Sequence, residues 1–350
     1  MMWFFVLLAP LAAVMGIVVY VWIRYYPAAT QGAKRVAPLP PAPKCAKRAD
    51  GESCEFETTD GVTLRGTYIA CKRPQRLGVL VFCHPLFASR WAVSDHLDAL
   101  RRGGFDVFTF DFRNHGTSDR TENYNPRPNL ARHELADLTA AIDYVTSRPD
   151  ADPNGVALMG MSKGGAAALH VATVDGRVWS VVADSAFSVD WVTAYYFRRY
   201  VGIFVPLLSA VVRKMPWFLY IGYARFIQAR VARELGVDVS DLLDVVDNVK
   251  LPVFLIQGGR DQYVPVEMAR TLKRRIGKQC KLWVVQKANH NESIHRAREK
   301  YEDRMVRFLV KNSGNEAWAP ATLPIDQRPI DPLPVTPAAQ DTPTFRGAAS

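Results

Sequence analysis

The chain has 350 residues, of which 49% are hydrophobic and 22% are charged, enough for one large α/β domain with appendages or for two ordinary domains. Its five cysteines are odd in number and include no zinc-type Cys-x-x-Cys pair, which excludes a disulfide scaffold and favours a reducing compartment, with a single Cys45–Cys54 bridge left open. The net charge is +10, but the basic residues before the first acid, Asp50, follow a hydrophobic segment, which favours a membrane flank over a nucleic-acid groove.

The first 26 residues are expected to form an uncleaved transmembrane anchor. Residues 3–23 carry no charge, and a helix rising about 1.5 Å per residue would cross a hydrocarbon core of about 30 Å. No Lys or Arg precedes the run and Arg24 closes it, which favours an anchor over a cleaved signal peptide or a buried helix. Because the basic flank is C-terminal, the positive-inside rule predicts a cytoplasmic main domain. Residues 27–52, rich in proline, alanine and basic residues, are expected to be an extended linker.

Strands and helices then alternate along the chain. Asp60-Gly61 separates two β-branched runs and indicates a hairpin. Six apolar runs indicate further strands, at residues 77–84, 105–112, 155–161, 179–187, 252–259 and 281–286. Helical patterns lie at residues 91–102, 129–148, 163–173 and 292–309. This order predicts an α/β fold with a mostly parallel eight-stranded sheet flanked by helices, and its active site belongs at the carboxyl ends of the strands.

A serine stands at one of these strand ends. Gly160-Met161-Ser162-Lys163-Gly164 matches G-x-S-x-G, after a strand and before a helix. Such a turn leaves no room for side chains two positions before and after the serine, whose hydroxyl projects above the sheet. Ser162 is therefore the candidate nucleophile, against the alternative that the stretch is only a glycine-rich link.

A serine hydroxyl needs a base, and the chain has seven histidines. His290 is the candidate because it follows the last expected strand and precedes a helix. The other six stand at a strand end, in a turn or within expected helices, where packing or surface roles are typical: His84, His96, His115, His133, His170 and His295.

The base needs a carboxylate to fix its tautomer and to stabilise its charged form. Asp261 follows the penultimate strand, whereas Asp184, after the preceding strand, is expected to be structural. The order Ser162, Asp261, His290 is the one that this topology dictates. Two backbone N–H groups should then stabilise an oxyanion: that of Lys163, at the helix start, and that of Leu86, after the strand of residues 77–84.

From about Ser53 to Asn312 the chain resembles the α/β-hydrolase fold family. Beside "GMSKGG", the segment "GGFDVFTFDFRNHGTSD" is similar to the family's G-[FY]-x-V-x-x-x-D-x-R-x-x-G-x-S stretch, "GGRDQYVP" to its acid loop and "NHN" to its histidine loop. The resemblance implies a hydrolase domain over residues 53–312 that uses the serine, aspartate and histidine named above.

The resemblance also implies that Asp111 and Arg113 are structural braces. One departure concerns the oxyanion hole, because the family commonly has His-Gly where this chain has His84-Pro85. Proline removes a backbone donor and restricts φ, but Leu86 keeps its own N–H.

Residues 186–249 interrupt the alternation with an aromatic and apolar insertion, where the family usually carries a helical cap. Its longest uncharged run, Tyr200 to Val212, is too short to span a bilayer. Ordinary cap packing is one interpretation, and a lid that touches the membrane and admits acyl chains is the other. The proline-rich residues 313–350 are expected to be a disordered tail.

The resulting hypothesis is a membrane-anchored, esterase- or lipase-like serine hydrolase that cleaves esters or thioesters of apolar or lipid-like acyl groups. Its expected partners are that substrate and the membrane, through the N-terminal helix and the cap, with no nucleic acid, no metal and no organic cofactor; neither H-E-x-x-H nor a P-loop pattern occurs. A serine at the turn disfavours dehalogenase and epoxide hydrolase chemistry. An acyltransferase with the same residues is the first alternative, and a non-catalytic binding or scaffold protein the second.

Overall fold

The computed structural model describes residues 16, 19, 20, 22–34, 50–204 and 213–314. The chain divides into two compact units, Met1–Asn315 and Glu316–Ser350, and the described residues all belong to the first. The expected tail lies outside the described residues from position 315 onward, so its disorder stays a prediction.

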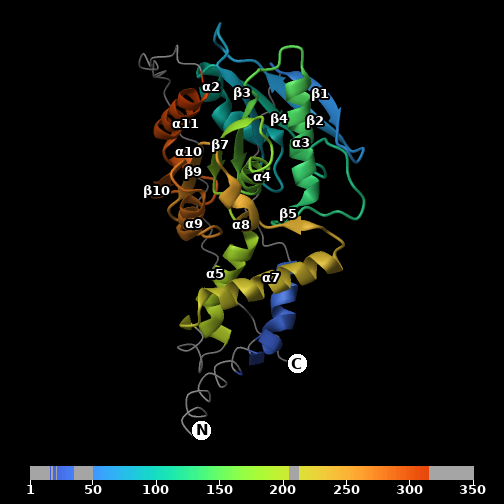
Figure 1. Ribbon diagram of the computed structural model, residues 1–350, viewed down its shortest axis with the longest axis vertical. Helices are drawn as coiled ribbons and strands as arrows, with labels where there is room; N and C mark the ends of the chain where they lie inside the picture. The colour runs from blue at the N-terminus through green and yellow to red at the C-terminus, as the bar shows by residue number, and fades with distance from the viewer. Residues whose placement is uncertain (1–15, 17–18, 21, 35–49, 205–212, 315–350) are drawn as a thin grey trace, which may run out of the picture. The chain divides into compact units, whose positions relative to one another are not determined.

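An eight-stranded sheet forms the centre of the first unit, in the order β1-β2-β4-β3-β6-β7-β9-β10 (Figure 1). β2 pairs antiparallel with β1 and with β4, and every other neighbouring pair is parallel. The predicted α/β class and mostly parallel eight-stranded sheet are therefore confirmed. The strands are Glu52–Glu57 (β1), Thr63–Ile69 (β2), Gly78–Cys83 (β3), Phe105–Phe110 (β4), Val156–Met161 (β6), Val178–Asp184 (β7), Val253–Gly258 (β9) and Cys280–Val285 (β10).

The apolar pattern explains the sheet. β3, β4, β6 and β9 are buried along their whole length, as expected of strands that helices cover on both faces. β1 and β2 alternate more, and Gly61, with φ of 77°, makes the turn between them.

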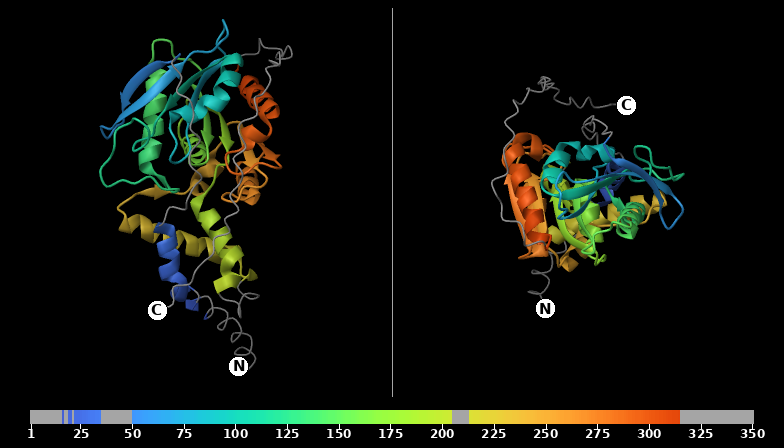
Figure 2. Two further views of the ribbon diagram at one scale, coloured as in Figure 1. Left: turned by 180° about the vertical axis from the view of Figure 1, so that it is seen from behind. Right: turned by 90° about the horizontal axis from the view of Figure 1, so that it is seen from above.

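Helices cover both faces of the sheet (Figures 1 and 2). On one face lie α2 (Ser94–Arg102), preceded by the short η1 (Arg90–Val93), and α11 (Arg298–Asn312), which contact each other. The other face packs against α3, α4, α8 and α9 through one continuous apolar core that includes Leu138, Leu169, Leu243 and Leu272. These four helices span Arg132–Ser147 (α3), Lys163–Val171 (α4), Leu242–Val245 (α8) and Val266–Ile276 (α9).

Some elements differ from the sequence-based expectation. The single helix expected at residues 292–309 is broken into α10 (Ser293–Arg296) and α11, because Ala297 leaves the helical region with φ of −148°. α9 has no counterpart among the helices expected from the sequence. A second, two-stranded sheet pairs β5 (Leu130–Ala131) with β8 (Val239–Ser240), and strands of two residues carry no readable periodicity.

The expected insertion contains the predicted helical cap. Its main helices are α5 (Val189–Phe204) and α7 (Trp217–Glu234), which pack on each other, and residues 205–212 between them lie outside the described residues. β8, α8 and the short η3 (Val246–Asn248) lead from the cap back to β9.

A helix of residues 22–34 packs against α7. The rings of Trp22 and Tyr223 stack with centroids 4.9 Å apart, and those of Tyr26 and Phe226 are 5.9 Å apart. The Tyr223 hydroxyl donates to the Trp22 carbonyl at 3.2 Å. Residues 27–34, expected within an extended linker, continue this helix, and Lys34 forms an ion pair with Glu234 of α7.

The predicted membrane location is corrected here. Within the described part of the chain, no helix combines the length and the apolar character needed to cross a membrane. Most of the expected anchor, residues 1–15, 17, 18 and 21, lies outside the described residues. The described end of the anchor continues into the helix of residues 22–34, which carries Arg24 and Lys34. The aromatic side chains of this helix contact the cap. The finding contradicts a single-pass anchor with a cytoplasmic main domain.

Candidate active site

Ser162 stands on a strained turn between β6 and α4. Its φ of 53° and ψ of −118° are rare for a residue with a side chain, and its N–H donates to the Asp184 carbonyl at 2.7 Å. The flanking glycines are required by space. A Cβ on Gly160 would lie 2.3 Å from the Gly164 carbonyl oxygen, and one on Gly164 would lie 2.2 Å from that of Cys83. The G-x-S-x-G spacing therefore has the steric cause expected from the sequence.

His290 brings an imidazole to this serine. It lies in the loop between β10 and α10, is buried, and its Nε2 is 2.9 Å from the Ser162 Oγ. Asp261, in the loop after β9, places its Oδ2 2.7 Å from the His290 Nδ1. The structure thus joins the three predicted residues in one chain of two hydrogen bonds, although they are far apart in the sequence.

Asp261 is held by three further donors. Its Oδ1 accepts hydrogen bonds from the N–H groups of Tyr263 and Val264, both at 2.8 Å, and its Oδ2 accepts one from the Gln257 amide at 2.9 Å. Its side chain is fully buried. A carboxylate with this many donors is fixed in orientation, so it can hold the His290 ring with Nδ1 protonated and Nε2 facing the serine.

Asp184, the alternative acid, takes a different position. Its Oδ1 accepts hydrogen bonds from the hydroxyls of Ser185 at 2.9 Å and Ser293 at 3.3 Å, and neither is part of the serine–histidine pair. Complete burial raises the pKa of this carboxyl to about 6. Its backbone carbonyl supports Ser162, so Asp184 serves the turn as expected of a structural residue.

Leu86 and Lys163, the candidate oxyanion donors, line one small cavity of about 10 Å³ together with His84, Pro85 and His115. His84 braces the turn that carries Leu86. Its Nδ1 donates to the Pro85 carbonyl at 2.8 Å, and its Nε2 accepts from the Phe112 N–H at 3.1 Å. Burial lowers the pKa of His84 to about 3, so the ring is neutral.

Asp111 and Arg113 brace the loop after β4. The Asp111 carboxylate accepts hydrogen bonds from the N–H groups of Arg90 at 2.6 Å and Thr117 at 3.0 Å. Arg113 is completely buried and donates to Asp137 at 2.7 Å and to Asp60 at 2.7 Å. Neither touches Ser162 or His290 in any described contact, which agrees with structural roles.

Cap residues approach the acid loop. The Tyr196 hydroxyl of α5 donates to the Gln262 carbonyl, next to Asp261. The Tyr263 ring lies with its centroid 5.6 Å from that of His290. Phe87, which follows Leu86, is 50% exposed. Aromatic side chains therefore lie beside His290 and next to Leu86, whereas the sequence indicated them only for the cap.

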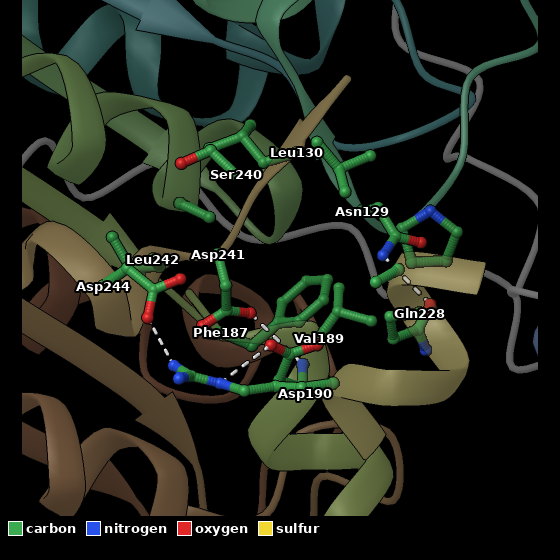
Figure 3. Close-up of a pocket in the computed structure, with 15 residues that line it drawn as sticks. Asn129, Leu130, Phe187, Val189, Asp190, Gln228, Ser240, Asp241, Leu242 and Asp244 are labelled. Atoms are coloured by element: carbon green, nitrogen blue, oxygen red, sulfur yellow. Dashed lines mark hydrogen bonds and ion pairs between the residues drawn. The ribbon is translucent and has the colours of Figure 1, made fainter. Parts of the chain in front are cut away.

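A larger cavity of about 230 Å³ lies between the cap and the core (Figure 3). Asp190 of α5, Asp241 and Asp244 line it with Arg225 of α7, whose guanidinium contacts Asp244 and lies 3.4 Å from Asp190. Burial and the neighbouring Asp241 raise the pKa of Asp190 to about 7. None of the three residues joined at Ser162 is among the described residues lining this cavity.

The described part of the chain contains no group of three or more His, Cys, Asp and Glu side chains that could hold a metal ion. The absence of a cofactor stays a prediction.

Comparison with known proteins places this geometry in context. The model of the prolyl oligopeptidase family matches residues 91–316, well over half of the chain. An uncharacterized protein of Mycobacterium tuberculosis is 23% identical over 303 residues, which cover 85% of this chain and 92% of that protein. A thiohydrolase of Arthrinium phaeospermum is 32% identical over 134 residues, or 38% of this chain and 42% of the relative.

Among solved structures, an esterase of Pyrococcus furiosus superposes with a TM-score of 0.57 at 24% identity, covering 75% of this chain and 92% of the esterase. This likeness shows the α/β-hydrolase fold.

Proposed function

Because the chain belongs to the prolyl oligopeptidase family, we propose that it is a serine hydrolase that cleaves carboxylic ester or thioester bonds through an acyl-enzyme. The observation that carries the proposal is the continuous pair of hydrogen bonds, 2.9 Å from Ser162 to His290 and 2.7 Å from His290 to Asp261. A nucleophile, a base and an orienting carboxylate in this order are the parts that acyl transfer needs.

The proposed reaction uses these residues in turn. The Ser162 hydroxyl attacks the carbonyl carbon while the His290 Nε2 takes its proton, and Asp261 stabilises the imidazolium. The N–H groups of Lys163 and Leu86 stabilise the negative oxygen of the tetrahedral intermediate. Collapse of the intermediate releases the alcohol or thiol, which takes the proton from His290. A water activated by the same base then hydrolyses the acyl-enzyme.

The aromatic side chains near the site support an apolar acyl group. Tyr263 lies beside His290, Tyr196 contacts the acid loop, and Phe87 stands exposed next to Leu86. The thiohydrolase relative adds support for thioesters, whereas the family's name favours peptides. We propose esters and thioesters ahead of peptides as substrates, because an apolar environment suits an acyl chain better than a polar peptide backbone.

Labelling with a fluorophosphonate probe tests the nucleophile. Wild-type protein should be labelled, and Ser162→Ala, whose buried side chain loses only a hydroxyl, should fold but stay unlabelled. Absence of label on folded wild-type protein, or equal labelling of Ser162→Ala, would overturn the proposal.

Substrate assays separate the reaction classes. p-Nitrophenyl esters of increasing chain length, acyl thioesters of N-acetylcysteamine and peptide p-nitroanilides are compared under one condition. Ester or thioester hydrolysis that exceeds peptide hydrolysis by tenfold or more supports the proposal, and the opposite order makes the protein a peptidase. An added acceptor alcohol that diverts most of the acyl group into a new ester would identify the acyltransferase alternative.

A further inference from the structure

The side chain of Lys163, directly after the nucleophile, is buried. Lysine ordinarily keeps its ammonium in water, yet only 5% of Lys163 is exposed, and its Nζ forms an ion pair with Glu134 of α3, itself 2% exposed. Burial lowers the pKa of the Lys163 amine, and the neighbouring Glu134 carboxylate opposes that shift. Removing two charges from water is costly, and apolar residues often replace such a pair without loss of stability. A contribution to stability therefore does not by itself explain this ion pair.

Glu134 is shared by several donors. Its Oε1 accepts hydrogen bonds from the Lys163 ammonium and the Tyr124 hydroxyl, and its Oε2 accepts one from the Ala131 N–H at 2.9 Å, which caps α3. The Glu134 carboxylate thus accepts hydrogen bonds from three donors, of which only the Lys163 ammonium is charged. Lys163 lies in the first turn of α4, where the helix N-terminus already favours an anion.

The two candidate oxyanion donors meet at one small cavity. Leu86 and Lys163 line the same cavity of about 10 Å³, which is the room of roughly one water, and Glu134 lines it as well. The Nε2 of His115, which lines this cavity, has no hydrogen-bond partner among the described residues. Gly164, in the first turn of α4, packs closely on the carbonyl oxygens of Cys83 and His84, and the Lys163–Glu134 ion pair adds a second contact of the same turn, to α3.

We infer that the buried Lys163–Glu134 ion pair is a positioning device for the oxyanion hole, which ties the first turn of α4, and with it the Lys163 N–H, to α3. The inference rests on the proposed function. Lys163 then acts twice, its backbone N–H on the substrate and its side chain through Glu134. A brace for the fold alone would leave catalysis unchanged once stability is restored.

The test compares Lys163→Met, Glu134→Gln and the double variant with wild type on one short p-nitrophenyl ester. The glutamine carbonyl can accept from the Ala131 N–H while its NH2 group donates to the Tyr124 hydroxyl, and methionine keeps the unbranched chain of lysine as far as Cε without the charge. We expect Lys163→Met to lower kcat about 10- to 100-fold with little change in KM, less than the loss of a whole oxyanion donor. The inhibition constant of phenylboronic acid, which forms a tetrahedral adduct with the serine, should rise in the same proportion.

The double variant separates positioning from stability. It leaves no buried charge unpaired, so its Tm should recover toward that of wild type while its kcat stays low. Recovery of both would show a merely structural pair and overturn the inference, as would unchanged kcat in folded Lys163→Met. If Lys163→Met does not fold, Glu134→Gln and the double variant carry the comparison.

Lys72→Met is the matched control, because Lys72 pairs with Asp98 at 3.1 Å on the surface, where both side chains are nearly half exposed. Its kcat and boronate inhibition should equal those of wild type. Failure of wild-type protein to hydrolyse any ester would overturn the proposed function and this inference together, whereas wild-type hydrolysis with no kcat loss in the folded variants overturns the inference alone.

Discussion

At the scale of single residues, the glycine after Lys163 has no room for a side chain. A Cβ on Gly164 would meet the carbonyl oxygens of Cys83 at 2.2 Å and His84 at 2.6 Å, and both are backbone atoms that cannot rotate away. We predict that Gly164→Ala lowers the free energy of unfolding by about 2–4 kcal/mol, measured by urea denaturation. Gly176→Ala is the control, since its Cβ would meet nothing within 4 Å and should change stability by less than about 1 kcal/mol. Wild-type stability in Gly164→Ala would contradict the steric account.

Single residues also show what the sequence could predict. Ser162, Asp261 and His290 each follow a strongly apolar strand, and parallel strands end at one edge, so the order of the elements already placed them together. The destination of the Lys163 side chain was not predictable. Its partner Glu134 lies on another helix, 29 residues earlier, and only the packing of α3 on α4 brings them into contact.

At the scale of elements, the junction of α5, α7 and α8 should make stability depend on pH. Its key group is Asp190, whose pKa of about 7 lies well above the roughly 3.9 of an unfolded aspartate. Because the folded state holds this proton more tightly, the contribution of Asp190 to stability is fully present below pH 4 and is lost as the pH rises through 7. Arg225, Asp241 and Asp244 are the charged groups around it.

We predict that Asp190→Asn, which cannot ionise, gains stability relative to wild type between pH 5 and pH 8 by on the order of 2 kcal/mol. Urea denaturation at the two pH values measures the change. Asp303→Asn, a change at an exposed residue of α11, is the control, and its free energy of unfolding should differ from that of wild type by the same amount at pH 5 and at pH 8. A constant difference for Asp190→Asn as well would mean that Asp190 is already ionised at pH 5 in the folded protein.

Elements with strong periodicity were predictable and short ones were not. Buried strands such as β3 and β6 are continuous apolar runs that match their observed bounds closely. β5 and β8 have two residues each and depend on a contact between the loop before α3 and the end of the cap. The break at Ala297 likewise has no glycine or proline to mark it.

At the scale of the whole molecule, the cap is built from segments distant in the chain. Trp22 and Tyr25 pack against the cluster of Ala194, Met215, Tyr220 and Ala224. We predict that Trp22→Ala speeds amide exchange in α7 by about 10- to 100-fold, as expected from a local loss of roughly 1–3 kcal/mol for a half-buried aromatic residue. Exchange in β6 should stay at the wild-type rate. Tyr20→Ala, at a side chain 57% exposed, is the control.

Equal exchange in α7 of Trp22→Ala and wild type would show that the helix of residues 22–34 contributes nothing to the cap. The pairing of this helix with α7 was beyond sequence reasoning, because an apolar aromatic run before a basic segment predicts a membrane flank as readily as an intramolecular contact.

The same pairing has a consequence for synthesis on the ribosome. Trp22 and Tyr223 are 201 positions apart, so at roughly 5–20 residues per second the helix of residues 22–34 leaves the exit tunnel about 10–40 s before α7 does. During that interval its tryptophan and tyrosines have no α7 to cover them, while the strands from β1 to β7 are being made. A chaperone that binds this emerging helix would therefore delay the assembly of the cap, or protect its exposed aromatic side chains until α7 is made.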